Sequence, residues 1–330
     1  MKPEEARQLK QSYPEADWHE THISYVLMTD EWAYKMMKSV KLDFLDFSTQ
    51  EQRKYNCEEE LRLNRRLAPD VYRAVVPVSR KDNKVVLESE EGDVLDHAVK
   101  MKRLDEQRLM SILLEKQQVT DRHIKQLAEV VAEFHDQAAV VHQQTSPSAF
   151  ADNFNELAEQ ANWVKEHIGT DYADIIAKAV SLSDQFLQEN SGLLQQRQEA
   201  GLVRDVHGDL HSHNIFLYDE PIIFDGISFN DALRQIDLLN EIAFLCMDLE
   251  ARKELALSRL FYDHYMLQMH ERSIEQVEHK ALFTYFKLYR ANVRVKVSVI
   301  DAQEKKEETP DVSEIKPYLE LMRKYISEMK

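Results

Sequence analysis

The sequence predicts an α+β fold with two unequal lobes, a small β-rich lobe over residues 1–97 and a larger helical lobe over residues 98–330. Runs of β-branched and aromatic residues separated by turn residues fill the first part of the chain, whereas apolar residues at helical spacing dominate the second. One β-rich island, residues 202–229, interrupts the helical part. The length of 330 residues suits one large domain or two unequal ones.

The small lobe is expected to contain two strand pairs and one helix. The alternating apolar runs that predict strands lie at residues 23–29, 32–37, 71–78 and 84–90. Ser48 and Glu51 have the spacing of a capping box, with Ser48 as the N-cap. The predicted helix runs from there to about Leu67, because Pro69 ends the helical pattern. The order is strand, strand, helix, strand, strand.

The larger lobe is expected to be mostly helical. Apolar residues repeat at three- and four-residue spacing over residues 127–134, 150–165, 172–188 and 281–300, and from residue 241 onward. Pro310 breaks a charged connector near the C-terminus. Within the island, the runs IFLY and IIFD flank the turn residues Asp219, Glu220 and Pro221, which predicts a tight β-hairpin.

Composition narrows the classes of partner. The chain has 42 Lys and Arg against 59 Asp and Glu, a net charge of −17, so neither nucleic acid nor an anionic membrane is expected as a partner. The only cysteines, Cys57 and Cys246, are far apart, which excludes a disulfide scaffold or a cysteine zinc site. The N-terminus has no apolar signal core and no apolar run approaches 18 residues, so a cytoplasmic location is expected. The sequence predicts no particular oligomeric state.

Three polar residues border the predicted hairpin. Asp209 and Asn214 precede its first strand and Asp225 follows its second. Because a hairpin brings its two ends together, we expect these carboxylate and amide oxygens to converge. Such hard oxygen ligands suit Mg²⁺. The alternative reading is a polar turn, in which Asp and Asn serve turn geometry alone.

The segment HGDLHSHN, residues 207–214, resembles the catalytic loop of the aminoglycoside phosphotransferase and choline kinase superfamily, which has a protein-kinase-like fold. The sequence is most similar to an uncharacterised bacterial branch in which this domain is often fused to a P-loop kinase domain, and the P-loop motif is absent here. The resemblance implies an ATP- and Mg²⁺-dependent transfer of the γ-phosphoryl group to a hydroxyl of an unidentified small molecule. It makes Asp209 the residue that accepts the hydroxyl proton, and Asn214 and Asp225 the metal ligands.

The resemblance also implies an ATP site in the small lobe. Lys35 would contact the α- and β-phosphates and Glu60 would hold it, with Lys38 and Glu59 as alternatives for the pair. Further on, Asp237 or Glu241 would match the Asp-Leu-Ala segment that follows the metal-binding aspartate.

The expected inter-lobe hinge begins at residue 98. The backbone near Ala98, Val99 and Met101 would meet the adenine. Two features depart from the family pattern. Residues 20–24 stand where a glycine-rich loop is expected, and Ser228 occupies a position expected to be acidic. How the phosphates are covered is therefore not predicted.

Three cations, Lys287, Arg290 and Arg294, fall on one face of the helix expected over residues 281–300. One explanation is pairing with acidic residues of the helical lobe, or exposure to solvent. The other is that Arg290 and Arg294 bind an anionic part of the acceptor, as guanidinium groups bind carboxylate or phosphate.

Two other functions are consistent with the same residues. The pattern H-x-D-x-H-x-H formed by His207, Asp209, His211 and His213 is also typical of zinc or manganese hydrolases. His-x-His at a strand end is a feature of amidohydrolase barrels. Such a barrel needs eight alternating strand–helix units, and this sequence has no such alternation. The other alternative is a catalytically silent kinase-fold protein that binds nucleotide and regulates a partner.

Overall fold

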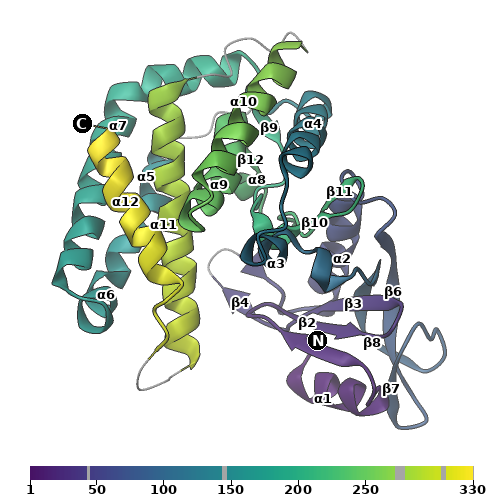
Figure 1. Cartoon of the computed structure of the whole chain (residues 1–330). Helices are drawn as coiled ribbons and strands as arrows, with labels where there is room; N and C mark the ends of the chain where they lie inside the picture. The colour runs from purple at the N-terminus through teal and green to yellow at the C-terminus, as the bar shows by residue number, and fades with distance from the viewer. Residues whose placement is uncertain (43–44, 143–146, 272–278, 306–309, 330) are drawn as a thin grey trace. The chain divides into compact units, whose positions relative to one another are not determined.

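The computed structural model describes residues 1–42, 45–142, 147–271, 279–305 and 310–329 (Figure 1). The chain divides into two compact units. The first contains residues 1–113 and 214–234, and the second contains residues 114–213 and 235–330. This division differs from the predicted boundary after residue 97, because the strand Asp93–Lys102 of the first unit's sheet crosses that boundary. Residues from the segment 214–234 also pack against the core of this unit.

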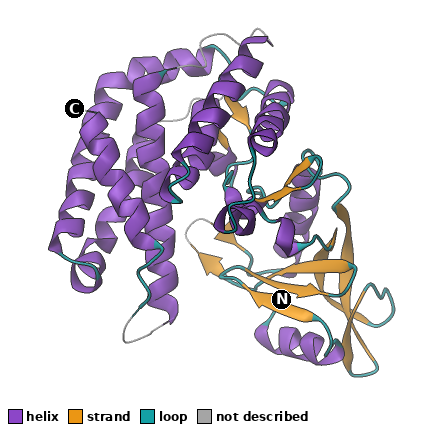
Figure 2. Ribbon diagram, viewed as in Figure 1, coloured by secondary structure: helices purple, strands orange, loops and turns teal. Residues whose placement is uncertain are grey.

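The first unit is built on a six-stranded antiparallel sheet with strand order β1-β2-β3-β8-β6-β7 (Figure 2). The strands are β1 (Asp17–Glu20), β2 (Ser24–Met28), β3 (Trp32–Met37), β6 (Tyr72–Lys81), β7 (Lys84–Leu87) and β8 (Asp93–Lys102). Helix α1 (Pro3–Ser12) packs its apolar residues against one face of this sheet. The four predicted strands correspond to β2, β3, β6 and β7 and are confirmed.

Strand β8 is the largest departure from the prediction in this unit. Ala98, Val99 and Met101, expected in a hinge, lie in the middle of the sheet, where β8 pairs with both β3 and β6. The strand was not recognised because its sequence alternates apolar residues with Asp96, His97 and Lys100. A charged residue in a central strand is tolerated only where a partner neutralises it.

Helix α2 (Gln50–Asn64) covers the other face of the sheet. Its N-cap is Thr49, and the capping box joins Thr49 to Gln52 and not Ser48 to Glu51 as predicted. The Ser48 hydroxyl donates to the Asp46 carboxylate instead, at 2.6 Å. A second short strand pair, β4 (Lys41–Leu42) and β5 (Leu45–Asp46), precedes the helix.

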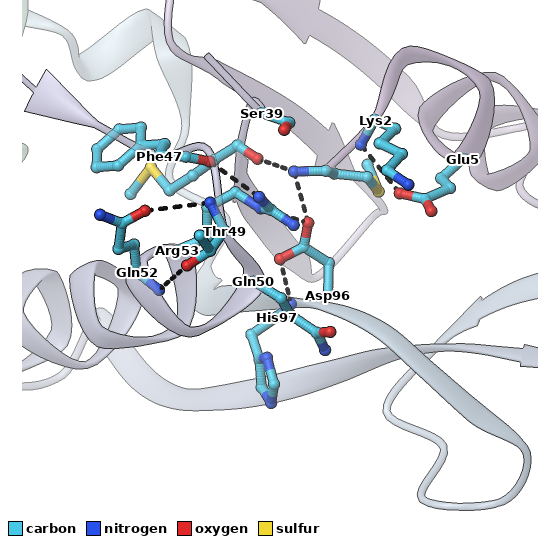
Figure 3. A network of polar contacts seen from close by, with 12 residues as sticks. Lys2, Glu5, Ser39, Phe47, Thr49, Gln50, Gln52, Arg53, Asp96 and His97 are labelled. Atoms are coloured by element: carbon cyan, nitrogen blue, oxygen red, sulfur yellow. Dashed lines mark hydrogen bonds and ion pairs between the residues drawn. The ribbon is translucent and has the colours of Figure 1, made fainter. Parts of the chain in front are cut away.

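A buried ion-pair network fixes α2 to the sheet (Figure 3). Arg53 donates from Nε to the Asp96 carboxylate of β8 at 2.8 Å, and from Nη1 to the Phe47 carbonyl at 2.9 Å. The same carboxylate accepts the Met1 amino group at 2.5 Å. Both Arg53 and Asp96 are buried. The network therefore joins α2, β8 and the segment that leads into α2.

The second unit is mainly helical. Its helices are α4 (Asp121–Gln137), α5 (Pro147–Asn155), α6 (Ala161–His167), α7 (Thr170–Glu199), α9 (Leu238–Ala251), α10 (Leu255–Glu271), α11 (Lys280–Lys305) and α12 (Ile315–Glu328). The predicted helices at 127–134, 172–188 and 281–300 are confirmed in α4, α7 and α11. The segment 150–165 is divided between α5, a 3-10 turn and α6. A hydrophobic core of the second unit joins α5, α7, α9, α11 and α12.

The shorter elements occur within or just after the β-rich island, or at the chain positions where one unit ends and the other begins. β9 (Val203–Asp205) pairs with β12 (Gln235–Asp237), and β10 (Ile215–Leu217) pairs with β11 (Pro221–Ile223). α3 (Met110–Glu115) and α8 (Asp231–Arg234) are short helices at the boundaries of the units. The predicted charged connector covers residues 302–311. Its first four residues form the end of α11, and residues 306–309 lie outside the described residues. In the described part of the chain, no helix is long and apolar enough to cross a membrane.

The Arg53–Asp96 pair gives a stability prediction. Replacing Arg53 by Met should lower the free energy of unfolding by about 3 kcal/mol, because a buried carboxylate loses its guanidinium partner. The matched control is Arg62→Met on the same helix, where Arg62 pairs with Glu59 at the surface and about 0.5 kcal/mol is expected. Urea unfolding of both variants measures the difference, and equal losses would contradict the role given to Arg53.

Candidate active site

Lys35 of β3 is the centre of the polar cluster in the first unit. Its Nζ lies 3.0 Å from Glu60 Oε1 and 2.6 Å from Asp225 Oδ1. The Lys35 side chain is 15% exposed and that of Glu60 is 1% exposed, whereas that of Asp225 is 44% exposed. The predicted Lys35–Glu60 ion pair is therefore present, and an accessible carboxylate shares the same cation.

Strand parity explains why Lys35 and not Lys38 forms this pair. Lys35 lies on the same face of β3 as Ala33 and Met37, which pack in the core covered by α2. Lys38 instead pairs with Glu20 at 2.7 Å. The other alternative partner, Glu59, pairs with a neighbouring arginine on the surface of α2.

The charges of this cluster stabilise one another. Burial by itself would lower the pKa of Lys35, but Asp225 and Glu60 outweigh it and hold that pKa well above its usual value. Burial raises the pKa of Glu60, and the ammonium group of Lys35 opposes that shift. Lys35 thus remains a cation despite its burial.

Two residues missed by sequence reasoning hold Asp225 in place. Asp225 has a left-handed backbone with φ of 60°, and its N–H donates to the Tyr72 hydroxyl at 3.1 Å. The next residue, Gly226, donates its N–H to Asn64 Oδ1 at 2.7 Å and accepts from Asn64 Nδ2 at 3.4 Å. Asn64 follows Glu60 by one helical turn, so one face of α2 contacts both Lys35 and the Asp225 segment.

The predicted β10–β11 hairpin is confirmed. The predicted convergence of Asp209 with Asn214 and Asp225 stays a prediction, because Asp209 belongs to the other unit. Ile215 pairs with Ile223, and the Phe224 N–H donates to the Asn214 carbonyl at 3.1 Å. Asn214 and Asp225 therefore lie at the same end of the β10–β11 hairpin, in the first unit. Their role as metal ligands stays a prediction.

Asp209 belongs to the second unit. Its N–H donates to Nδ1 of His207 at 3.2 Å, and its Oδ2 lies 3.3 Å from Nε2 of His211. The side chain is 35% exposed. Burial would raise the pKa of Asp209, but His211, His207 and Arg294 outweigh that effect and hold it well below its usual range. The ionised carboxylate is the form that accepts a proton.

Glu241 of α9 holds the backbone of this loop. Its buried carboxylate accepts the N–H groups of His207 at 3.0 Å and Gly208 at 3.1 Å. Of the two alternatives for this segment, Glu241 thus contacts the loop. Asp237 instead caps α9 and forms a bidentate pair with Arg197, at 2.6 and 2.8 Å.

Arg290 of α11 holds the loop from a different side. It donates from Nη1 to the Gly208 carbonyl at 3.1 Å and from Nε to Asn240 Oδ1 at 2.7 Å. Its guanidinium also lies over the Phe244 ring, 4.8 Å from the centroid. Arg290 is buried, its Nη1 and Nε bind Gly208 and Asn240, and its Nη2 has no hydrogen-bond partner among the described residues. The role of Arg290 in binding the acceptor stays a prediction.

The histidines of the H-x-D-x-H-x-H pattern make local contacts. Nδ1 of His207 and Nδ1 of His211 accept the N–H groups of Asp209 and His213, respectively. Nε2 of His213 accepts from Arg252 at 2.7 Å. Among the residues that the structure describes, no group of three His, Cys, Asp or Glu side chains is arranged to hold a metal ion. The zinc or manganese hydrolase alternative gains no support from these contacts.

Glu241 gives a prediction for the pH dependence of stability. Burial raises its pKa from 4.5 to about 7, against the opposing effects of Arg290 and the loop N–H groups. Between pH 5 and 7 the folded state retains a proton that the unfolded state has lost, so this group's contribution to stability falls as pH rises. Glu241→Gln should flatten that fall by up to about 1 kcal/mol per pH unit.

The measurement is urea unfolding of wild type and Glu241→Gln at pH 5, 6, 7 and 8. The exposed residue Glu220 in the hairpin turn supplies the control Glu220→Gln, which should keep the wild-type slope. If Glu241→Gln also keeps that slope, Glu241 does not titrate in this range.

Known proteins resemble this chain in sequence over most of its length. The model of the phosphotransferase enzyme family matches residues 24–267. An uncharacterised protein of Mycobacterium tuberculosis is 32% identical over 295 residues, which cover 87% of this chain and 55% of that protein. The chain thus spans about half the length of the curated relatives that it matches.

Two solved structures share the fold. A choline/ethanolamine kinase family protein from Mesorhizobium loti is 10% identical, with a TM-score of 0.54 over 99% of this chain and 96% of that one. Amicoumacin kinase in complex with AMP-PNP, Ca²⁺ and Ami is 14% identical, with a TM-score of 0.55 over 98% and 93%. The predicted protein-kinase-like α+β fold is confirmed. Because the family model matches most of its length, the chain belongs to the phosphotransferase enzyme family.

Proposed function

We propose that this protein transfers the γ-phosphoryl group of ATP, with Mg²⁺, to a hydroxyl group of a small molecule. The observation that carries the proposal is the cluster of Lys35, Glu60 and Asp225, in which one buried cation is held by one buried and one accessible carboxylate. Among members of a phosphotransferase family, such a cluster suits a nucleotide phosphate and its metal ion.

The residues present fit both ligands. Lys35 supplies a cation for the phosphates, and Asp225 and Asn214 supply hard oxygen ligands at one end of the hairpin. When bound, Mg²⁺ neutralises phosphate charge that a chain of net charge −17 would otherwise repel. The complex of amicoumacin kinase with AMP-PNP and Ca²⁺ supports the pairing of nucleotide and divalent ion.

We propose a different segment for the adenine contacts than the one predicted from the sequence. The backbones of Val99 and Met101 face strand partners on both sides, and Ala98 pairs with Val76 of β6, so their hydrogen-bonding groups serve the sheet. We expect the adenine edge to be met by the segment after β8, which begins at Arg103.

Asp209 is the proposed proton acceptor. Its ionised carboxylate would orient the acceptor hydroxyl and take its proton, while the hydroxyl oxygen forms a bond to the γ-phosphorus and the bond from that phosphorus to ADP breaks. The hydrogen bonds of Glu241 and Arg290 hold the loop that carries it. Positioning and charge would supply most of the rate acceleration.

Two substitutions separate binding from chemistry. In wild type, Mg²⁺ with ATP should raise the melting temperature, since a ligand at 100 times its dissociation constant stabilises the native state by about 2.7 kcal/mol. Asp209→Asn should keep this shift and lose transfer to the acceptor by at least about 100-fold. Asp225→Ala should lose the shift, because it removes a metal ligand.

The readouts are thermal unfolding with and without Mg²⁺ and ATP, and ADP formation with pooled metabolites as acceptors. Stoichiometric zinc with no nucleotide shift would contradict the proposal in favour of a hydrolase. The catalytically silent regulator would be favoured by a different result. Mg²⁺ with ATP would then raise the melting temperature, but with every metabolite pool the wild type would form ADP no faster than Asp209→Asn.

A further inference from the structure

We propose that the acceptor carries an anionic group, a carboxylate or phosphate, that binds to Arg294 of α11 beside Asp209. This inference deepens the proposed function and rests on it. It assigns the class of acceptor, which the family does not determine.

Two lysines of α11 have carboxylate partners, whereas Arg294 has a different environment. Lys287 pairs with Glu250 at 2.8 Å, and Lys296 pairs with Glu156 at 2.6 Å. For these two, the explanation by internal pairing holds. Arg294 has no carboxylate within ion-pair distance among the described residues, and its Nε is buried without a hydrogen-bond partner there. The Arg294 side chain as a whole is only partly buried and also hydrogen-bonds with Tyr318. Its unused, buried Nε donor is costly unless a ligand satisfies it.

The position of Arg294 follows from Arg290. Arg290 reaches the carbonyl of Gly208, the residue before Asp209. Arg294 follows on the same face of α11 by one helical turn, so it also faces the side of the helix that meets the loop. Its guanidinium lies over the Tyr318 ring of α12, 5.4 Å from the centroid, which limits its freedom.

Nearby carboxylates leave Arg294 available to a ligand. Asp209 and Asp248 both interact with it electrostatically. Asp248 is already engaged, because it accepts the Ser212 N–H at 2.9 Å and lies 3.5 Å from Nε of Arg252. In the proposed function, Asp209 orients the acceptor hydroxyl and takes its proton. A small molecule that presents a hydroxyl to Asp209 would therefore meet a guanidinium beside it.

The charge of the anchor selects the class of acceptor. A guanidinium binds carboxylate or phosphate oxygens through charge-assisted hydrogen bonds. The same charge, partly removed from water, repels an amino alcohol or an aminoglycoside. Hydroxy acids, sugar acids and phosphorylated sugars fit this combination of groups, and cationic acceptors do not.

The first test uses inorganic sulfate as the anion. With Mg²⁺ and ADP saturating and ionic strength held constant with chloride, sulfate should raise the melting temperature of wild type by about 2 °C or more. Arg294→Gln should lose this rise. Lys296→Gln, which removes a cation of the same helix that is paired with Glu156, should keep it.

An equal sulfate effect in wild type and Arg294→Gln, or no effect in wild type, would overturn the inference. This test needs no turnover. A sulfate effect that depends on Arg294, in a protein that shows no stabilisation by Mg²⁺ and ATP, would support the anion site and reject the proposed function. The reverse result would reject the anion site alone.

The second test compares acceptors that share one ring: glucose, glucuronate, glucose 6-phosphate and glucosamine. Turnover should favour the anionic members, and Arg294→Gln should raise their KM by about 10- to 100-fold with kcat changed by less than about threefold. If Arg294 only kept Asp209 ionised, the variant would shift the pH profile of kcat and leave KM unchanged. That result, or a preference for glucosamine that Arg294→Gln does not alter, would refute the proposal.

Discussion

The arrangement of the first unit depends on one buried cation. Lys35 is stable inside the protein only because Glu60 and Asp225 neutralise it from two different segments. Glu60 reaches it because α2 is fixed against the sheet through Arg53, and Asp225 reaches it because Asn64, also on α2, holds the following glycine. The helix thus places both acidic partners, and a shift of α2 would disturb both at once.

The second unit uses buried polar contacts in the same way. The loop that carries Asp209 has its N–H groups bound by Glu241 and one carbonyl bound by Arg290. These contacts fix the backbone and leave the Asp209 carboxylate partly exposed. In both units, polar side chains hold the backbone around a partly exposed aspartate: Tyr72 and Asn64 at Asp225, and Glu241 and Arg290 at Asp209. Accessibility is what distinguishes Asp209 and Asp225 from the acidic residues that only support them.

Local sequence was sufficient wherever the interacting residues are close along the chain. The loop motif at 207–214, the β10–β11 hairpin and the helices α4, α7 and α11 were all predicted, because turn chemistry and helical spacing operate over a few residues. The resemblance of the loop also identified the family, and it named Lys35 and Glu60 correctly as a pair. A capping box one residue away from the predicted one shows the limit of such local signals.

Tertiary structure decided the features that depend on partners far apart in the chain. The buried face of α2 includes the polar residues Arg53, Glu60 and Asn64, so an apolar stripe does not identify this face in the sequence. Strand β8 was not predicted for the same reason, because it contains the buried charged residue Asp96. The Lys35–Asp225 contact joins residues 190 positions apart. Arg290 and Arg294 are indistinguishable by helical spacing, and only the tertiary structure shows that Arg290 bonds to the Gly208 carbonyl whereas Arg294 lies over the Tyr318 ring. A buried charge is specified by its partner, and sequence alone does not show which distant residue that partner is.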